Sequence, residues 1–156
     1  MKVIKAPGSL EEFDVMDNVV FLAGSIEMGK AEDWQSKVTN ALKDMPNLMI
    51  LNPRRDDWDS SWEQSIHNAQ FREQVEWELE ALEAATHIII YFQPGTMSPI
   101  SLLELGLFIS SNLYVCCPPG FWRKGNVDIV VEKYAINRMV YEDLDILLVA
   151  LKEDLV

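Results

Sequence analysis

Two glutamates lie where helical periodicity expects apolar side chains, and a pair of carboxyl groups is typical equipment for glycosyl transfer. The segment 99–109, PISLLELGLFI, is apolar nearly all round and predicts a buried helix whose only charge is Glu104. In the helical segment 71–85, Glu78 falls within the predicted apolar stripe. That stripe consists of Phe71, Val75, Leu79 and Leu82. Of two acids in different environments, one can attack an anomeric carbon while the other handles the proton of the leaving group.

Each glutamate also has a structural interpretation. A buried carboxylate needs a partner or a raised pKa, and Glu104 could gain a partner in an ion pair with Arg54 or Arg55. Glu78 could lie at the edge of its stripe and extend to water. Gly106 disfavours a helix, so its presence predicts that a backbone or a ligand approaches closely there.

The segments that would position these acids alternate between short apolar runs and helical patterns, which favours an α/β fold with helices on both faces of a sheet. We expect one domain over residues 1–156, a flavodoxin-like or Rossmann-like sandwich with a mainly parallel sheet of four or five strands. The predicted strands are 19–23, 48–51, 87–92, 113–116 and a short 138–141. The predicted helices are 33–42, 71–85, 99–110 and 144–151. Ligands of such sheets bind outside the carboxyl ends of the strands, which selects the loops 24–30, 52–62, 93–98 and 118–126.

Composition limits the classes of partner. The chain has 156 residues, of which 49% are hydrophobic, and a formal net charge of −12. A protein with this negative charge repels phosphate backbones. We therefore expect neither nucleic-acid nor membrane binding. No window has the length of a membrane span, and the first residues lack the apolar core of a signal peptide, so a cytoplasmic protein is expected. Cys116 and Cys117 are adjacent and predict buried free thiols in a reducing compartment.

The sequence implies no metal and no redox cofactor. Only two histidines occur, His67 and His87, and they are far apart in the chain. No GxGxxG pattern follows the first predicted strand. An oxocarbenium-like transition state calls for carboxylates, which the chain supplies.

Five motifs in order resemble those of the nucleoside 2-deoxyribosyltransferase-like proteins. They extend over roughly residues 19–130, and each would be weak evidence alone. They are FLAGSIEMG (21–29), NPRRDDWD (52–59), FREQVEWELEALEAA (71–85), SPISLLELGLF (98–108) and RKGNVDI (123–129).

The resemblance implies a flavodoxin-like domain that cleaves the N-glycosidic bond of 2′-deoxynucleosides, and it assigns roles to particular residues. Glu104 aligns with the glutamate that attacks C1′ and forms a covalent deoxyribosyl-enzyme. Glu78 aligns with a second acid, usually aspartate, that protonates the leaving base. Its extra methylene alters the reach of the carboxyl. Capture of the intermediate by another base gives transfer, and capture by water gives hydrolysis.

Further positions are implied to line the substrate site. Gly24, Ser25 and Ile26 would form the sugar–base pocket, although Ser25 is also a common turn residue. Asn126 aligns with an asparagine that reaches into the active site of a neighbouring subunit, which implies a homo-oligomer. The alternative for Asn126 is an ordinary loop residue beside Gly125.

Two residues expected near the 5′ end of the substrate predict opposite preferences for a 5′-phosphate. Ser98 stands where related 5′-monophosphate hydrolases carry a phosphate-binding serine, although serine is also a favoured helix N-cap. Glu27 stands where those hydrolases carry an arginine, and it would repel phosphate. Lys30, Arg54 or Arg55 could supply the missing charge.

Loop aromatics have two open interpretations, since they could stack on a nucleobase or anchor the loops. They are Trp58, Trp62, Phe121 and Trp122. For the whole chain the leading hypothesis is cleavage or transfer at the N-glycosidic bond of 2′-deoxynucleosides or their 5′-monophosphates. The alternatives are a non-catalytic nucleotide-sensing module on the same fold, in which both glutamates hold ribose hydroxyls, and a structural partner subunit.

Overall fold

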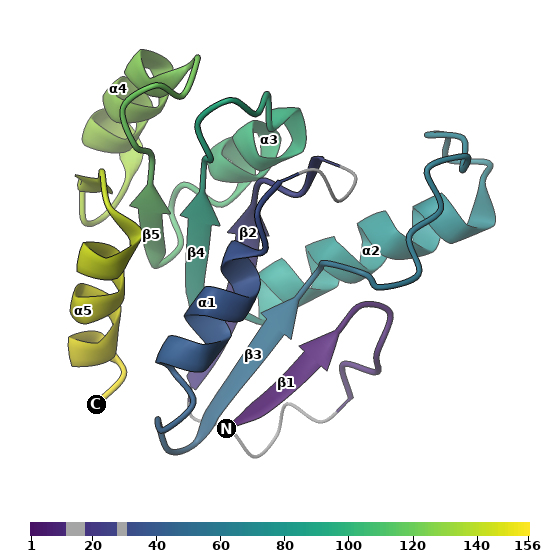
Figure 1. Cartoon of the computed structure of the whole chain (residues 1–156), viewed down its shortest axis with the longest axis horizontal. Helices are drawn as coiled ribbons and strands as arrows, with labels where there is room; N and C mark the ends of the chain where they lie inside the picture. Colours follow the sequence, from purple (N-terminus) through teal and green to yellow (C-terminus); the bar gives the residue numbers. More distant parts are fainter. Residues whose placement is uncertain (12–17, 28–30) are drawn as a thin grey trace.

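The computed structural model describes residues 1–11, 18–27 and 31–156, and in them one parallel sheet organises the chain. Its strand order is β1-β3-β2-β4-β5-β6, and every adjacent pair is parallel (Figure 1). Without β1 this is the flavodoxin-like order, which confirms the predicted α/β class. The strands are β1 (Lys2–Lys5), β2 (Asn18–Gly24), β3 (Leu48–Asn52), β4 (His87–Tyr91), β5 (Leu113–Cys116) and β6 (Val140–Tyr141).

Helices cover both faces of the sheet, because its central strands are apolar on both sides. Helices α1 (Trp34–Ala41) and α5 (Leu144–Asp154) pack on one face. Helices α2 (Ala69–Ala84), α3 (Pro99–Leu107) and α4 (Lys124–Tyr134) pack on the other. Cys116 and Cys117 are buried and free, as predicted.

The chain reverses its direction of winding between β2 and β4. It goes from β2 through α1 to β3 on one side, and then through α2 to β4 on the other side of β2. A crevice at the carboxyl ends of such a strand pair is the usual ligand site of an open α/β sheet. The segments that follow β2 and β4, and the beginning of α3, meet there.

Three elements differ from the sequence prediction. The sheet has six strands in the described residues, because the short β1 pairs with β3 at the edge. The segment 118–126, predicted as loop, enters helix α4 at Lys124, so Asn126 lies in the first helical turn. Helix α3 ends at Leu107 rather than at residue 110.

The buried faces of α2 and α3 also differ from the prediction. On α2 the buried residues are Gln74, Trp77, Ala81 and Leu82. Val75 and Leu79, predicted to face inward, are each 37% exposed, so the true stripe is rotated. Helix α3 is not buried all round, because Ile100, Leu103 and Leu107 are 58%, 59% and 60% exposed. A Cβ added at Gly106 meets nothing within 4 Å, so no backbone approaches it in the described chain, and the predicted close approach by a backbone is wrong.

Gly24 does have a close neighbour, since a Cβ there would lie 2.4 Å from the carbonyl oxygen of Tyr91. Its φ of +135° also lies outside the range of other residues. We expect Gly24→Ala to lower the free energy of unfolding by about 3 kcal/mol. The matched Gly106→Ala should raise it by about 0.5–1 kcal/mol, as an open helical position allows. Urea denaturation measures the free energy of unfolding of both variants. Equal values for Gly24→Ala and Gly106→Ala would contradict this account of the end of β2.

Candidate active site

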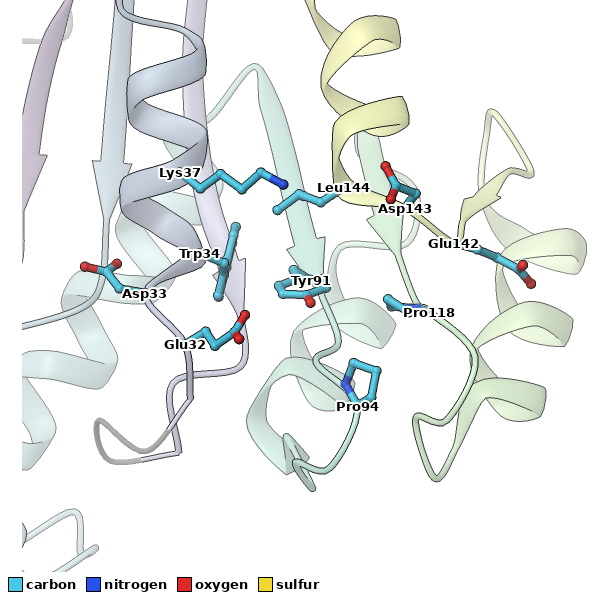
Figure 2. Close-up of a pocket in the computed structure, with 10 residues that line it drawn as sticks. All are labelled: Glu32, Asp33, Trp34, Lys37, Tyr91, Pro94, Pro118, Glu142, Asp143 and Leu144. Carbon is cyan, nitrogen blue, oxygen red and sulfur yellow. The ribbon is translucent and has the colours of Figure 1, made fainter.

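The carboxyl edge of the sheet carries a pocket on its α1 and α5 face. The pocket has a volume of about 360 Å³ (Figure 2). Three of its four carboxylates have structural roles: Asp33 caps α1, Asp143 caps α5 and Glu142 pairs with Lys124. Neither Glu78 nor Glu104 lines it. The lining residues are Glu32, Asp33, Trp34, Lys37, Tyr91, Pro94, Pro118, Glu142, Asp143 and Leu144.

The opposite face holds the two glutamates, and α3 turns a polar stripe toward the sheet. Ser98, Ser101 and Glu104 follow one another at intervals of three residues and are all buried. Glu104 is only 6% exposed. Three apolar side chains of the same helix, Ile100, Leu103 and Leu107, are exposed, whereas Leu105 is buried beside the polar stripe. A helix that buries its one carboxylate and exposes three large apolar side chains departs from the pattern of a packing element, and such departures concentrate at functional sites.

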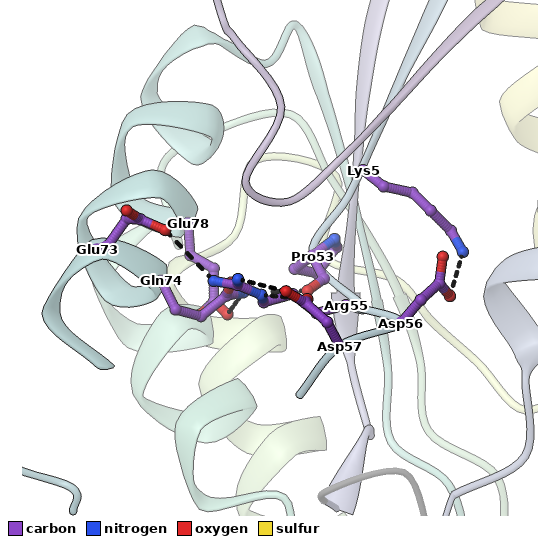
Figure 3. Close-up of polar contacts among 8 residues, drawn as sticks. All are labelled: Lys5, Pro53, Arg55, Asp56, Asp57, Glu73, Gln74 and Glu78. Atoms are coloured by element: carbon purple, nitrogen blue, oxygen red, sulfur yellow. Dashed lines mark hydrogen bonds and ion pairs between the residues drawn. The ribbon is translucent and has the colours of Figure 1, made fainter. Parts of the chain in front are cut away.

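Glu78 is half-buried on α2, one turn after the buried Gln74 and one turn before the buried Leu82. The amide nitrogen of Gln74 donates to Oε1 of Glu78 at 2.7 Å and to the carbonyl oxygen of Pro53 at 3.0 Å (Figure 3). These bonds orient the Glu78 carboxyl from the end of β3. The side-chain oxygen of Gln74, Oε1, is buried without a hydrogen-bond partner in the described chain.

The two carboxyls are electrostatically coupled. Burial raises the pKa of Glu78 to about 7, against the opposing effect of the Gln74 hydrogen bond. Burial, and then the charge of Glu78, raises the pKa of Glu104 to about 8. At neutral pH one proton is therefore favoured on the pair, and the two groups titrate as a unit. A singly protonated pair supplies one nucleophile and one acid.

Neither arginine neutralises this pair, so the structural interpretation of Glu104 is wrong. Arg54 donates to the carbonyl oxygens of Ala31 and Glu32 and to the Gln35 side chain, which fixes the start of α1. Arg55 binds both oxygens of Asp57 and reaches Glu73 at 3.4 Å (Figure 3). Both guanidinium groups are engaged away from Glu104.

A cluster of three hydroxyl groups marks the junction of β2, β4 and α3. Ser25 Oγ lies 2.6 Å from Ser98 Oγ and 2.9 Å from Thr96 Oγ1, and those two oxygens are 2.8 Å apart. The backbone N–H of Gln93 donates to Ser25 Oγ at 2.9 Å. Trp34 donates from its indole to the Ser25 carbonyl. Ser25 is thus a buried member of a network rather than a simple turn residue.

Ser98 stands at the N-cap position of α3, as predicted, but its side chain makes no capping hydrogen bond. Glu27 occupies that role from another loop. Its Oε1 accepts hydrogen bonds from the backbone N–H of Ser98 at 2.7 Å and of Met97 at 3.1 Å. The carboxylate of Glu27 therefore lies where the partial positive charge of the helix begins. Lys30, the other candidate cation of this loop, lies outside the described residues.

The loop aromatics divide into anchors and one exposed ring. Trp58 packs edge-on against Trp62, over which Arg55 lies at 5.1 Å. Phe121 is buried against Phe92. Trp122 is 47% exposed and donates to the carbonyl oxygen of Met97, beside the start of α3.

Two further predicted site residues, Ile26 and Asn126, make no hydrogen bond to the hydroxyl cluster within the described chain. The carbonyl oxygen of Ile26 accepts a bond from Ala31 and closes the loop after β2. Asn126 is exposed on α4.

In the described parts of the chain, no three His, Cys, Asp or Glu side chains form a group that could hold a metal. No helix there is long and apolar enough to cross a membrane.

Comparison with known families agrees with this geometry. A family model described as nucleoside 2-deoxyribosyltransferase like matches residues 17–121, about two thirds of the chain. The chain belongs to the nucleoside 2-deoxyribosyltransferase-like family. No curated protein matches it. The matched region contains β2 to β5 with α1, α2 and α3, and therefore both glutamates and the hydroxyl cluster.

Sequence reasoning missed three polar positions in this family member. Thr96 completes the hydroxyl cluster, Ser101 lies on the buried face of α3, and Gln74 orients Glu78. The spacing of Ser98, Ser101 and Glu104 at successive helical turns was the available signal for the second of these. Gln74 stands one turn before Glu78, which was the signal for the third.

The buried carboxyl of Glu104 should make stability depend on pH. Its folded-state pKa is about 8 against an ordinary 4.5, so the folded chain binds more protons than the unfolded chain between these values. The free energy of unfolding therefore falls as the pH rises across this range. Glu104→Gln should remove this loss. The difference in free energy of unfolding between the variant and the wild type should therefore grow in favour of the variant from pH 5 to pH 8, by on the order of 1–3 kcal/mol.

Chemical denaturation at several pH values measures this difference. Glu80→Gln, an exposed change on α2, is the control and should show no such trend. If the difference in free energy of unfolding between Glu104→Gln and the wild type is constant with pH, burial does not raise the pKa of Glu104.

Proposed function

We propose that the protein cleaves or transfers at the N-glycosidic bond of 2′-deoxynucleosides by double displacement through Glu104. The observation that carries this proposal is a pair of carboxyls with raised pKa values, the buried Glu104 on α3 and the half-buried Glu78 on α2, which lie on the same face of the sheet. Membership of the family supports the substrate class. Two carboxyls with raised pKa values, held without a counter-charge, suit acid–base and nucleophilic work.

In the first step a carboxylate oxygen of Glu104 forms a bond to C1′ as the bond from C1′ to the base nitrogen breaks. The electron pair of that bond leaves with the base, and Glu78 donates a proton to it. In the second step the nitrogen of an acceptor base, or water, attacks C1′ and releases Glu104. Glu78 takes the proton of the acceptor. Two inversions at C1′ give net retention.

The raised pKa values of the pair set a condition on this mechanism, which needs a proton on Glu78 and an ionised Glu104. The bound substrate favours this distribution of charge. A base nitrogen placed beside Glu78 would favour the protonated form of that carboxyl, and the developing positive charge at C1′ favours ionised Glu104.

The outer face of α3 supports a homo-oligomer with sites near subunit interfaces. Ile100, Leu103 and Leu107 form an exposed apolar stripe on the helix that carries Glu104. Met97 and Trp122 extend it beside the start of the helix. A contiguous apolar patch of this kind is typical of an interface. Asn126, exposed on the neighbouring α4, is then positioned to serve the site of a partner copy.

Base release measured by chromatography tests the proposed chemistry. Wild type should release or exchange the base of at least one 2′-deoxynucleoside, with an acceptor base distinguishing transfer from hydrolysis. Glu104→Gln should lower the rate by about 10³-fold or more, because the nucleophile is lost. Glu78→Gln should lower it by about 10²–10⁴-fold, as for a general acid. Glu80→Gln should retain wild-type activity. A folded wild type without turnover would favour the nucleotide-sensing alternative.

Sedimentation equilibrium tests the proposed assembly. Wild type should form an oligomer at micromolar concentration, and Leu103→Lys should shift it toward the monomer by placing a charge in the apolar stripe. Val149→Lys is the matched control, since Val149 is 60% exposed on α5 at the other face. A monomeric wild type, or equal effects of both changes, would contradict the assignment of this face.

A further inference from the structure

The side-chain amide of Gln74 faces two acceptors at once. Its nitrogen, Nε2, lies 3.0 Å from the carbonyl oxygen of Pro53 and 2.7 Å from Oε1 of Glu78 (Figure 3). A backbone carbonyl can only accept a hydrogen bond, so the end of the amide beside Pro53 must be the NH₂ group. Each of the two amide hydrogens then has one acceptor. The orientation of Gln74 is therefore fixed whether or not Glu78 is ionised.

The other end of the amide confirms that this orientation is held against a cost. Oε1 of Gln74 is buried and has no hydrogen-bond partner in the described chain. A buried acceptor without a partner is unfavourable. Turning the amide over would place this oxygen against the carbonyl oxygen of Pro53, which is worse. Gln74 thus acts on Glu78 as a donor and not as an acceptor.

The contact makes the two oxygens of the Glu78 carboxyl unequal. Oε1 accepts from Gln74, which favours the proton of the neutral carboxyl on the other oxygen, Oε2. Oε2 receives no hydrogen bond from the described residues, and Glu78 is half-buried. The proton is therefore favoured on the oxygen that the chain leaves available to a ligand.

We propose that Gln74 is a positioning residue that directs the leaving-group proton to Oε2 of Glu78 and stabilises the carboxylate that remains. The inference rests on the proposed function. As the bond from C1′ to the base nitrogen breaks, its electron pair goes to that nitrogen, and the O–H bond at Oε2 breaks to supply the proton. The negative charge left on Glu78 is shared with Oε1. There the bond from Gln74 strengthens, since hydrogen bonds to charged groups are the stronger ones.

The same contact adjusts the acidity of Glu78. Burial raises the pKa of Glu78 to about 7, and the hydrogen bond from Gln74 opposes this rise. Without that bond the carboxyl should hold its proton to a higher pH. Glu104 is the titratable group coupled to it, and Arg55 is paired with carboxylates of its own. The alkaline limb of the pH profile of kcat/KM should report the loss of the last proton from the coupled pair.

The pH profile of kcat/KM for a 2′-deoxynucleoside tests the proposal in wild type and Gln74→Met. Methionine is similar in length and volume but cannot donate a hydrogen bond. Gln74→Met should lower kcat by about 10- to 100-fold, as for a lost bond to a charged group. It should also move the alkaline limb to higher pH by at least about half a unit. Gln70→Met, at an exposed position one turn earlier on α2, is the matched control and should keep kcat within about twofold.

The outcomes separate the two proposals. A folded Gln74→Met with the wild-type kcat overturns the role of Gln74 and leaves the glycosyl chemistry intact. A lower kcat with an unmoved alkaline limb does the same, because it indicates a merely structural role. A wild type that turns over no 2′-deoxynucleoside overturns the proposed function itself.

Nuclear magnetic resonance of the wild type tests the contact even if Gln74→Met fails to fold. The side-chain amide resonances of Gln74 should shift as the pH crosses the raised pKa values of the carboxyl pair. The corresponding resonances of Gln70 should not shift in this way, and the shift at Gln74 should be lost in Glu78→Gln. Gln74 resonances that do not respond to pH in the wild type would overturn the proposal.

Discussion

The constraint on which the account depends is the removal of two carboxyl groups, Glu104 and Glu78, from water. Removing a carboxylate from water costs several kcal/mol unless a charge or hydrogen bonds compensate for it. In the described chain no cation is paired with Glu104 or Glu78, and both pKa values rise instead. The side-chain amide of Gln74 orients Glu78 without neutralising it, and the charge of Glu78 further raises the pKa of Glu104. The fold thus keeps two acids poised near neutral pH, at a cost in stability that a purely structural protein would have no reason to bear.

Helix α3 shows how this cost is distributed. Its short sequence contains enough leucine and isoleucine to cover the sheet, yet Ser101 and Glu104 face inward with Leu105, while Ile100, Leu103 and Leu107 are exposed. Exposed apolar surface is unfavourable in a monomer. In the proposed function this orientation couples catalysis to assembly, because one side of α3 holds the acid and the other side is the surface proposed for a second copy of the chain.

The central architecture was predictable from the sequence because long apolar runs dominate it. Strands β2, β3, β4 and β5 are buried on both faces and are found within about one residue of their predicted ends. Strand β1 is short, lies at the edge and pairs through backbone contacts that leave little pattern, so it was not predicted. The short β6 was predicted, but its start was placed two residues too early. Helix α4 was missed because Gly125 lies in its first turn and prolines precede it. The inward face of α3 could not come from periodicity, which assigns the apolar side of a helix to the core. The Glu27 contact joins two loops, and only the tertiary fold brings them together.

The covalent intermediate on Glu104 is the central claim, and intact-protein mass spectrometry after rapid quenching tests it most directly. Wild type mixed with excess 2′-deoxynucleoside should gain the mass of one deoxyribosyl group, and peptide mapping should locate it on the Glu104 side chain within α3. Glu104→Gln should gain nothing, and addition of an acceptor base should discharge the wild-type adduct. Base release by the wild type with no adduct at any quench time, or an adduct on Glu78, would contradict the account.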